Sequence, residues 1–143
     1  MKKIRLTSKE IVFIARLEEE KSPETAKWLF GLLPWQLTMI HVSWSGSACF
    51  AQLEELAYSV KPENPIRIPS KGEIIIYPGN IPTLQMGGEF FLSWGPCSIA
   101  TQLGHLFGNH VLTIVEGLED LERFGKRVHL EGAQPLLVEL VEG

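Results

Sequence analysis

The sequence predicts a mostly β protein whose short strands close into a barrel or stack as a sandwich. About ten short segments alternate in polarity or are rich in β-branched residues, Gly and Pro separate them at even spacing, and only two segments have clear helical spacing. The chain has 143 residues, of which 45% are hydrophobic and 21% are charged. These values are ordinary for a globular protein, and we expect one domain spanning residues 1–143.

The first quarter of the chain predicts a hairpin followed by a helix. Residues 4–7 and 11–17 are strand candidates joined by a polar turn. A helix is expected over residues 22–33, because Pro23 suits the first helical position and the apolar residues recur at helical spacing: Ala26, Leu29, Phe30 and Leu33. Pro34 then ends the helix.

The middle of the chain contains strand candidates separated by turns. They cover residues 36–44, 48–53, 73–77 and 89–94, with a short extended piece at 66–68. The segment 73–77 (E-I-I-I-Y) is apolar on both faces, which is typical of a strand that is covered on both sides.

The last third predicts a mixture of strands and a short helix. Strands are expected over residues 110–115, 128–131 and 136–141, and a helix over 118–124 that ends at Gly125. Helical spacing is also present, weakened by a glycine, at Ile99, Leu103, Leu106 and Phe107.

Composition excludes several classes of function. The formal net charge of −4 argues against a nucleic-acid partner, which would favour a basic surface. The chain has 16 Glu and a single Asp, Asp120, and it has no calcium-loop, dinucleotide or P-loop motif. Cys49 and Cys97 lack metal-ligand spacing. We therefore expect no metal and no cofactor.

The location expected from the sequence is the cytoplasm, with no membrane partner. No stretch approaches the roughly 20 apolar residues of a membrane span, and the first residues lack the apolar run of a signal peptide. In that compartment the two cysteines are expected to be reduced thiols.

Five residues are candidates for a ligand-binding site. Trp44, Tyr77 and Trp94 each lie near the end of a strand beside Gly, Pro or Ser, and aromatic rings with a polar edge often line pockets. His105 and His110 flank a segment with glycines that permit close approach. The alternative for each is a structural role, in the core for the aromatic residues and on the surface for the histidines. No catalytic residue is assigned.

The other ionisable candidates have simpler interpretations. His41 alternates with apolar residues and is expected to be half-buried and hydrogen-bonded, whereas His129 is expected on a solvated strand surface. Glu73 and Glu89 begin strands and would form an acid–base pair only if the fold brings them together.

Two segments resemble cyclophilins, the prolyl isomerases. S-P-E-T-A-K-W-L at residues 22–29 is similar to the start of that family's first helix, and H-V-L-T-I-V-E-G-L at 110–118 with R-F-G at 123–125 resembles its later motifs. The resemblance implies a closed eight-stranded antiparallel barrel with a helix over each end. The closest likeness is to small prokaryotic cyclophilin-like domains of unassigned activity.

The resemblance does not extend to the isomerase machinery. M-G-G-E-F at residues 86–90 echoes the family's Q-G-G-D-F, but no Arg or Lys follows Lys71 before the end of that segment, so the catalytic Arg has no counterpart there. We expect a barrel that binds a small organic molecule or a peptide in a pocket lined by aromatic and His residues. Whether it is an enzyme is left open.

Two alternatives remain. One is a prolyl isomerase with a displaced catalytic group. The other is an interaction module that forms a homo-oligomer through an apolar patch on Trp28, Leu32 and Trp35.

Overall fold

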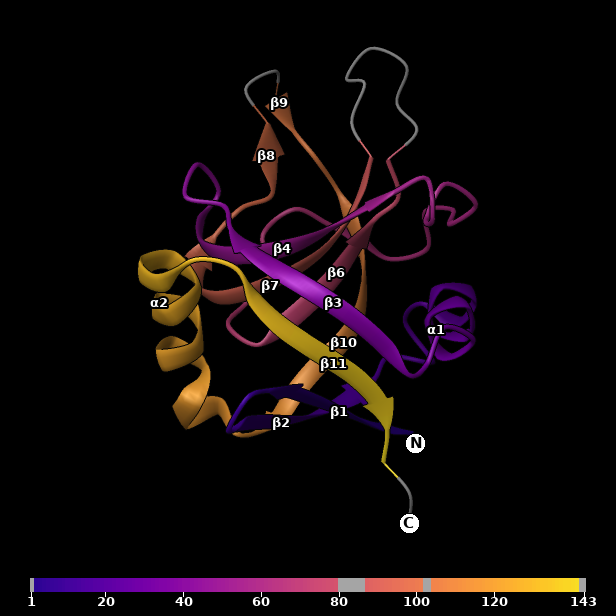
Figure 1. The fold of residues 1–143 in the computed structure, drawn as a ribbon. Helices are drawn as coiled ribbons and strands as arrows, with labels where there is room; N and C mark the ends of the chain where they lie inside the picture. Colours follow the sequence, from indigo (N-terminus) through magenta and orange to yellow (C-terminus); the bar gives the residue numbers. More distant parts are fainter. Residues whose placement is uncertain (1, 80–86, 102–103, 142–143) are drawn as a thin grey trace.

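A closed antiparallel barrel forms the body of the protein in this computed structural model, which describes residues 2–79, 87–101 and 104–141 (Figure 1). Neighbouring strands pair in the order β2-β1-β11-β3-β4-β7-β6-β10, and β10 pairs with β2 to close the ring. The eight strands in this part of the chain are β1 (Lys3–Ser8), β2 (Ile11–Leu17), β3 (Trp35–His41), β4 (Gly46–Glu54), β6 (Glu73–Tyr77), β7 (Gly88–Cys97), β10 (Gly108–Glu116) and β11 (Gln134–Leu140). The predicted mostly β barrel is confirmed.

Short elements complete the fold. Strand β5 (Pro65–Ile66) pairs with the start of β10, and β8 (Ala100–Thr101) pairs with β9 (Gly104–His105) in a separate ladder. Helix α1 (Pro23–Phe30) and helix α2 (Leu121–Glu131), which follows the 3-10 turn η1 (Leu118–Asp120), lie on opposite sides of the barrel (Figure 1). No helix in the described part of the chain is long and apolar enough to cross a membrane.

Side chains from all eight barrel strands fill the interior. Because successive residues of a strand point to opposite faces, each strand contributes alternate residues to this core, such as Leu37 and Met39 from β3 and Ile74 and Ile76 from β6. Leu29 of α1 and Phe124 of α2 close the core at its two sides.

A second apolar group, which we call the outer cluster, lies on the outer face of β4, β7 and β6. Ile75 and Tyr77 alternate with the interior residues of β6 and join it, which explains why the E-I-I-I-Y strand is apolar on both faces. Residues that precede β8 and follow β9 cover it. Its buried members are Val42, Ala48, Phe50, Ile75, Tyr77, Phe91, Ile99 and Leu106.

The weak helical spacing at residues 99–107 does not correspond to a helix in the described residues. They form the β8–β9 ladder instead, and Leu103 lies outside the described residues. The helical spacing arose because Ile99 and Leu106, one on each side of the ladder, both turn into the outer cluster.

The prediction at the C-terminal helix is also wrong in two respects. Helix α2 does not end at Gly125, and residues 128–131 are its last turn rather than a strand. The helix continues through Gly125, and this position is glycine because a Cβ there would overlap the indole of Trp94. The buried residues Leu121, Phe124, Gly125 and Val128 follow helical spacing, which is the signal that the interpretation of 128–131 as a strand overlooked.

Helix α1 is shorter than predicted, and a residue far away in the sequence caps its start. It ends at Phe30, and the Ser22 side chain makes no capping hydrogen bond. The carboxylate of Glu63 accepts hydrogen bonds from the backbone N–H groups of Glu24 and Thr25 at 2.8 and 3.2 Å instead. A residue distant in the sequence thus accepts hydrogen bonds from the first backbone N–H groups of α1.

Candidate functional site

A row of three polar side chains crosses the outer face of the barrel. Gln52 of β4 lies opposite Glu89 of β7, and Glu89 lies opposite Tyr77 of β6. Residues directly opposite in antiparallel strands lie side by side on one face, with Cβ atoms about 5 Å apart. We call Gln52, Glu89 and Tyr77 the polar row. Gln52 is exposed, whereas Glu89 and Tyr77 are 6% and 2% exposed.

The buried end of the polar row has no polar partners. The Glu89 carboxyl group makes no side-chain hydrogen bond or ion pair with any residue that the structure describes. Burial raises the pKa of Glu89 to about 7. The hydroxyl of Tyr77 is also buried without a hydrogen bond, and burial, followed by the Glu89 charge, raises the pKa of Tyr77. Buried polar groups are normally satisfied, so an unsatisfied pair marks a candidate site.

Close backbone packing positions Glu89. A Cβ at Gly88 would lie 2.8 Å from the carbonyl oxygen of Tyr77, and one at Gly87 would lie 2.6 Å from the Cα of Glu54. Only glycine fits at both positions, so the G-G-E sequence brings the first residue of β7 against both neighbouring strands. The glycines of M-G-G-E-F therefore set the place of the carboxyl group.

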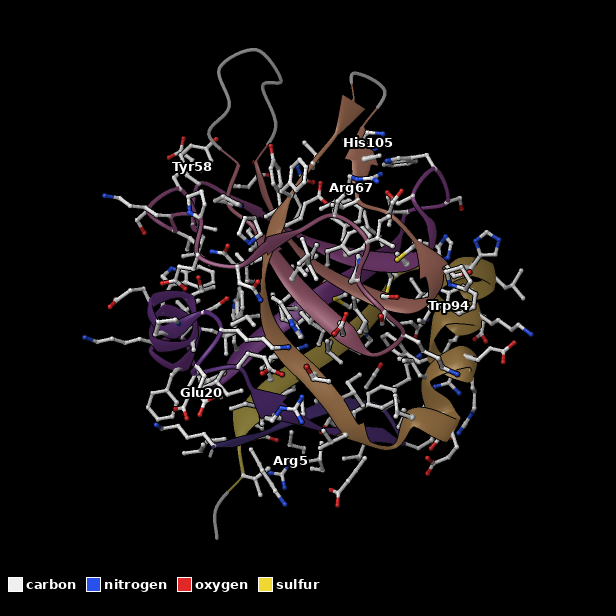
Figure 2. All side chains as sticks on the ribbon, turned by 180° about the vertical axis from the view of Figure 1, so that it is seen from behind. Arg5, Glu20, Tyr58, Arg67, Trp94 and His105 are labelled. Carbon is white, nitrogen blue, oxygen red and sulfur yellow. The ribbon has the colours of Figure 1, made fainter. Side chains whose placement is uncertain are left out.

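Two of the predicted site residues meet at the β8–β9 ladder. Trp44, 67% exposed, donates a hydrogen bond from Nε1 to the carbonyl oxygen of Ala100 at 3.1 Å, and Ala100 pairs with His105. Nδ1 of His105 lies 3.3 Å from Nη1 of Arg67, and Figure 2 shows these two side chains together at the end of the barrel.

His110 is in a different, buried network. Its Nε2 lies 2.8 Å from Oγ1 of Thr113, whose hydroxyl donates to Glu18, so Nε2 must carry the proton and donate to Thr113. Burial lowers the pKa of His110, although Glu73 and Glu18 oppose that effect. Burial disfavours the charge of Glu18, but hydrogen bonds from Thr113 and Arg16 outweigh it and lower its pKa. This network joins β2 to β10 at the barrel closure.

Trp94 lies away from the β8–β9 ladder, beside α2 (Figure 2). Its ring packs against Gly125 and lies 5.8 Å from that of His41. His41 is half-buried, and its Nδ1 lies 2.9 Å from Oγ of Ser43 and 3.1 Å from Nδ1 of His129. His129 is therefore on a helix against another ring and not on a strand surface as predicted.

The structure thus brings Trp44 and His105 together, places Tyr77 in the polar row, and leaves Trp94 and His110 elsewhere. Glu73 and Glu89 do not form a pair. Glu89 lies opposite Tyr77, at the other end of β6 from Glu73, and the four steps along β6 from Glu73 to Tyr77 span about 13 Å. The sequence signal for Glu89 was its place between two glycines and a strand, which gave no sign of its burial.

The part of the chain that the structure describes contains no cluster of side chains suited to a metal ion. No set of three or more His, Cys, Asp or Glu residues there is arranged to hold a metal ion. Cys49 and Cys97 are free thiols, and burial raises the pKa of both.

Two solved structures have a fold similar to that of this chain. McbB, in a structure described as a complex with tryptophan, has a TM-score of 0.71 at 17% identity over 95% of this chain, which covers 44% of the McbB chain. This chain therefore spans less than half of McbB. The hypothetical protein AF2241 from Archaeoglobus fulgidus has a TM-score of 0.59 at 19% identity, covering 98% of this chain and 95% of its own.

At these identities the two structures show the fold alone. No curated protein matches the chain. A family model described as a protein of unknown function, DUF3830, matches residues 4–140. The chain belongs to the DUF3830 family.

Proposed function

We propose that this protein binds a small organic molecule at the polar row, with Glu89 and Tyr77 as the polar groups that recognise it. The observation that carries the proposal is the buried Glu89 carboxyl group with no partner among the described residues, directly opposite a Tyr77 hydroxyl that also has none. The apolar outer cluster lies beside them. Apolar surroundings with a few convergent polar groups are typical of ligand sites.

The chemistry of the pair favours a nitrogen-containing ligand. A neutral carboxyl group can donate one hydrogen bond and accept others, and a carboxylate accepts only. With a pKa of about 7, Glu89 exists in both forms near neutral pH. A ligand amine or N–H group would complete the hydrogen bonding of Glu89, and an ammonium group would stabilise its ionised form.

One further observation supports this proposal, and another bears on the isomerase alternative. The structure of McbB, which has the same fold over the part that matches this chain, is described as a complex with tryptophan. The isomerase alternative gains no support here, because the polar row contains no cationic side chain to act on a prolyl amide.

The test is ligand-detected NMR with L-tryptophan as the first probe, followed by a panel of small amines and amino acids. We expect at least one probe to bind. Glu89→Gln should weaken this binding, and the affinity should change as pH crosses 7. Glu116→Gln, which changes an exposed carboxylate on β10, is the matched control. Binding that Glu89→Gln leaves unchanged, or no binding across the panel, would overturn the proposal.

A further inference from the structure

The barrel is not hydrogen-bonded along the whole junction of β3 and β4. The register pairs are Ile40 with Phe50 and His41 with Cys49, and the next bond, from the N–H of Val42 to the carbonyl of Ala48, lies beyond the end of β3. Residues 35–39 and 51–54 have no partners across this junction, and Figure 1 shows β3 and β4 diverging. We call the space between these two stretches the seam.

The backbone pattern of β3 shows which groups face the seam. Thr38 lies opposite Pro135 of β11, and proline has no N–H, so this cannot be a hydrogen-bonded pair. The hydrogen-bonded pairs with β11 are therefore those at Leu37 and Met39 on either side. It follows that the N–H and C=O groups of Gln36 and Thr38 point toward β4.

The same reasoning applies to β4. The hydrogen bond from the N–H of Val42 to the carbonyl oxygen of Ala48 identifies these two residues as a hydrogen-bonded pair. In an antiparallel ladder, every second pair after it is of the same kind. On β4 the groups that point toward β3 are those of Phe50 and then Gln52. Both edges of the seam thus present unpaired strand backbone, from Gln36 and Thr38 on one side and Gln52 on the other.

The floor of the seam is apolar. A hollow of about 390 Å³ lies over it. Leu37 and Leu53, each 6% exposed, form part of the floor, and Ile40 and Leu56 are 39% and 45% exposed on its walls. No charged residue lines the hollow, but the exposed Glu54 and Glu55 directly precede Leu56.

We propose that the seam is a docking site for an extended peptide, which pairs with the open edges of β3 and β4, places apolar side chains on Leu37 and Leu53, and carries a basic residue near Glu54 and Glu55. An extended backbone can satisfy two facing strand edges together, because its N–H and C=O groups alternate to both sides. Glu54 and Glu55, at one end of the seam, favour a positively charged residue at that end of the peptide. The seam uses the backbone groups of Gln52, whereas the polar row contains its side chain, so the peptide proposal does not rest on the ligand proposed for Glu89 and Tyr77.

The experiment is a titration of the ¹⁵N-labelled protein with the acetylated, amidated peptide Val-Thr-Val-Thr-Val-Lys. We expect amide shifts and new hydrogen-exchange protection at Gln36, Thr38 and Gln52. The same peptide with N-methyl groups on alternate residues keeps its side chains but loses backbone donors. It should bind at least tenfold more weakly, since each lost hydrogen bond weakens binding roughly three- to tenfold.

Two substitutions at one position form a matched pair. Thr38→Pro removes an N–H that faces the seam and leaves the bonds of β3 to β11 in place, so peptide affinity should fall roughly three- to tenfold. Thr38→Ala keeps that N–H and should change affinity less than about twofold. The circular dichroism and urea midpoint of each variant establish that it is folded.

Three results would overturn the proposal. One is equal binding of the N-methylated and unmodified peptides, and another is no binding of either to folded protein. The third is protection of Gln36, Thr38 and Gln52 without peptide in a dimer detected by sedimentation, which would assign the seam to a second copy of the chain. Glu89→Gln should leave peptide binding intact, so failure here is distinguishable from failure at the polar row.

Discussion

At the scale of single residues, Glu89 is a carboxyl group whose burial disfavours its ionised form. Its folded pKa of about 7 lies above the ordinary value of 4.5 expected for the unfolded chain, so the folded state binds the proton more tightly. The contribution of this group to the free energy of unfolding is therefore fully present below pH 4.5 and is lost as pH rises toward 7. Above pH 7 the protein holds a buried negative charge.

Glu89→Gln should remove this pH dependence. The amide is neutral at every pH, so the variant should exceed the wild type in free energy of unfolding at pH 8 by roughly 2–3 kcal/mol, and the difference should shrink toward pH 4.5. Urea unfolding at the two pH values measures this, with Glu116→Gln as the control for an exposed carboxylate. A Glu89→Gln variant less stable than the wild type at pH 8 would mean that the carboxylate has a partner.

The histidine pair at the end of α2 is also a residue-scale feature. Burial lowers the pKa of His41, and the charge of His129 lowers it further. His129→Ala should therefore raise the pKa of His41 toward its ordinary value. An NMR titration of the His41 ring protons would measure the change, and an unchanged or lower pKa would show that the two rings are apart in solution. His105→Ala, at the β8–β9 ladder, is the control.

At the scale of elements, the local sequence pattern predicted a strand correctly where the polarity of its residues reflects which faces of the strand are buried. The strands at residues 11–17 and 73–77 have the predicted bounds, because their polarity already reflects burial on one face or on both. The segment 128–131 failed because four residues cannot distinguish the last turn of a helix from a strand. The role of Gly125 depends on Trp94, which is 31 positions earlier, and no local rule includes that contact.

Gly125→Ala tests that contact. In an open helix alanine would stabilise by about 1 kcal/mol, but here its Cβ would overlap the Trp94 indole, so we expect a net loss of roughly 1–3 kcal/mol. Gly31→Ala, where a Cβ meets only ordinary contacts at 3.5 Å and φ is −68°, is the matched control and should not destabilise. Chemical denaturation measures both, and equal effects would show that Trp94 can move aside.

At the scale of the whole molecule, the barrel could be predicted but the candidate site only in part. Tyr77 was predicted as a site residue from its place at a strand end, whereas the burial of Glu89 depends on the registers of β4, β6 and β7 together. Such registers pair residues far apart in the sequence, so no local pattern contains them. The seam is hidden for the same reason, since β3 and β4 each have an ordinary strand sequence.

Native-state hydrogen exchange tests the seam without any ligand. Amides that are bonded within the barrel should exchange only when much of the protein unfolds, whereas amides that face water should exchange orders of magnitude faster. We therefore expect slow exchange at Leu37 and Met39, which bond to β11, and fast exchange at their neighbours Gln36 and Thr38. The two sets lie on one strand, so local flexibility of β3 cannot explain a difference between them. If all four amides were equally protected, the ring would be closed at β3 and β4, and the peptide proposal would lose the open backbone on which it depends.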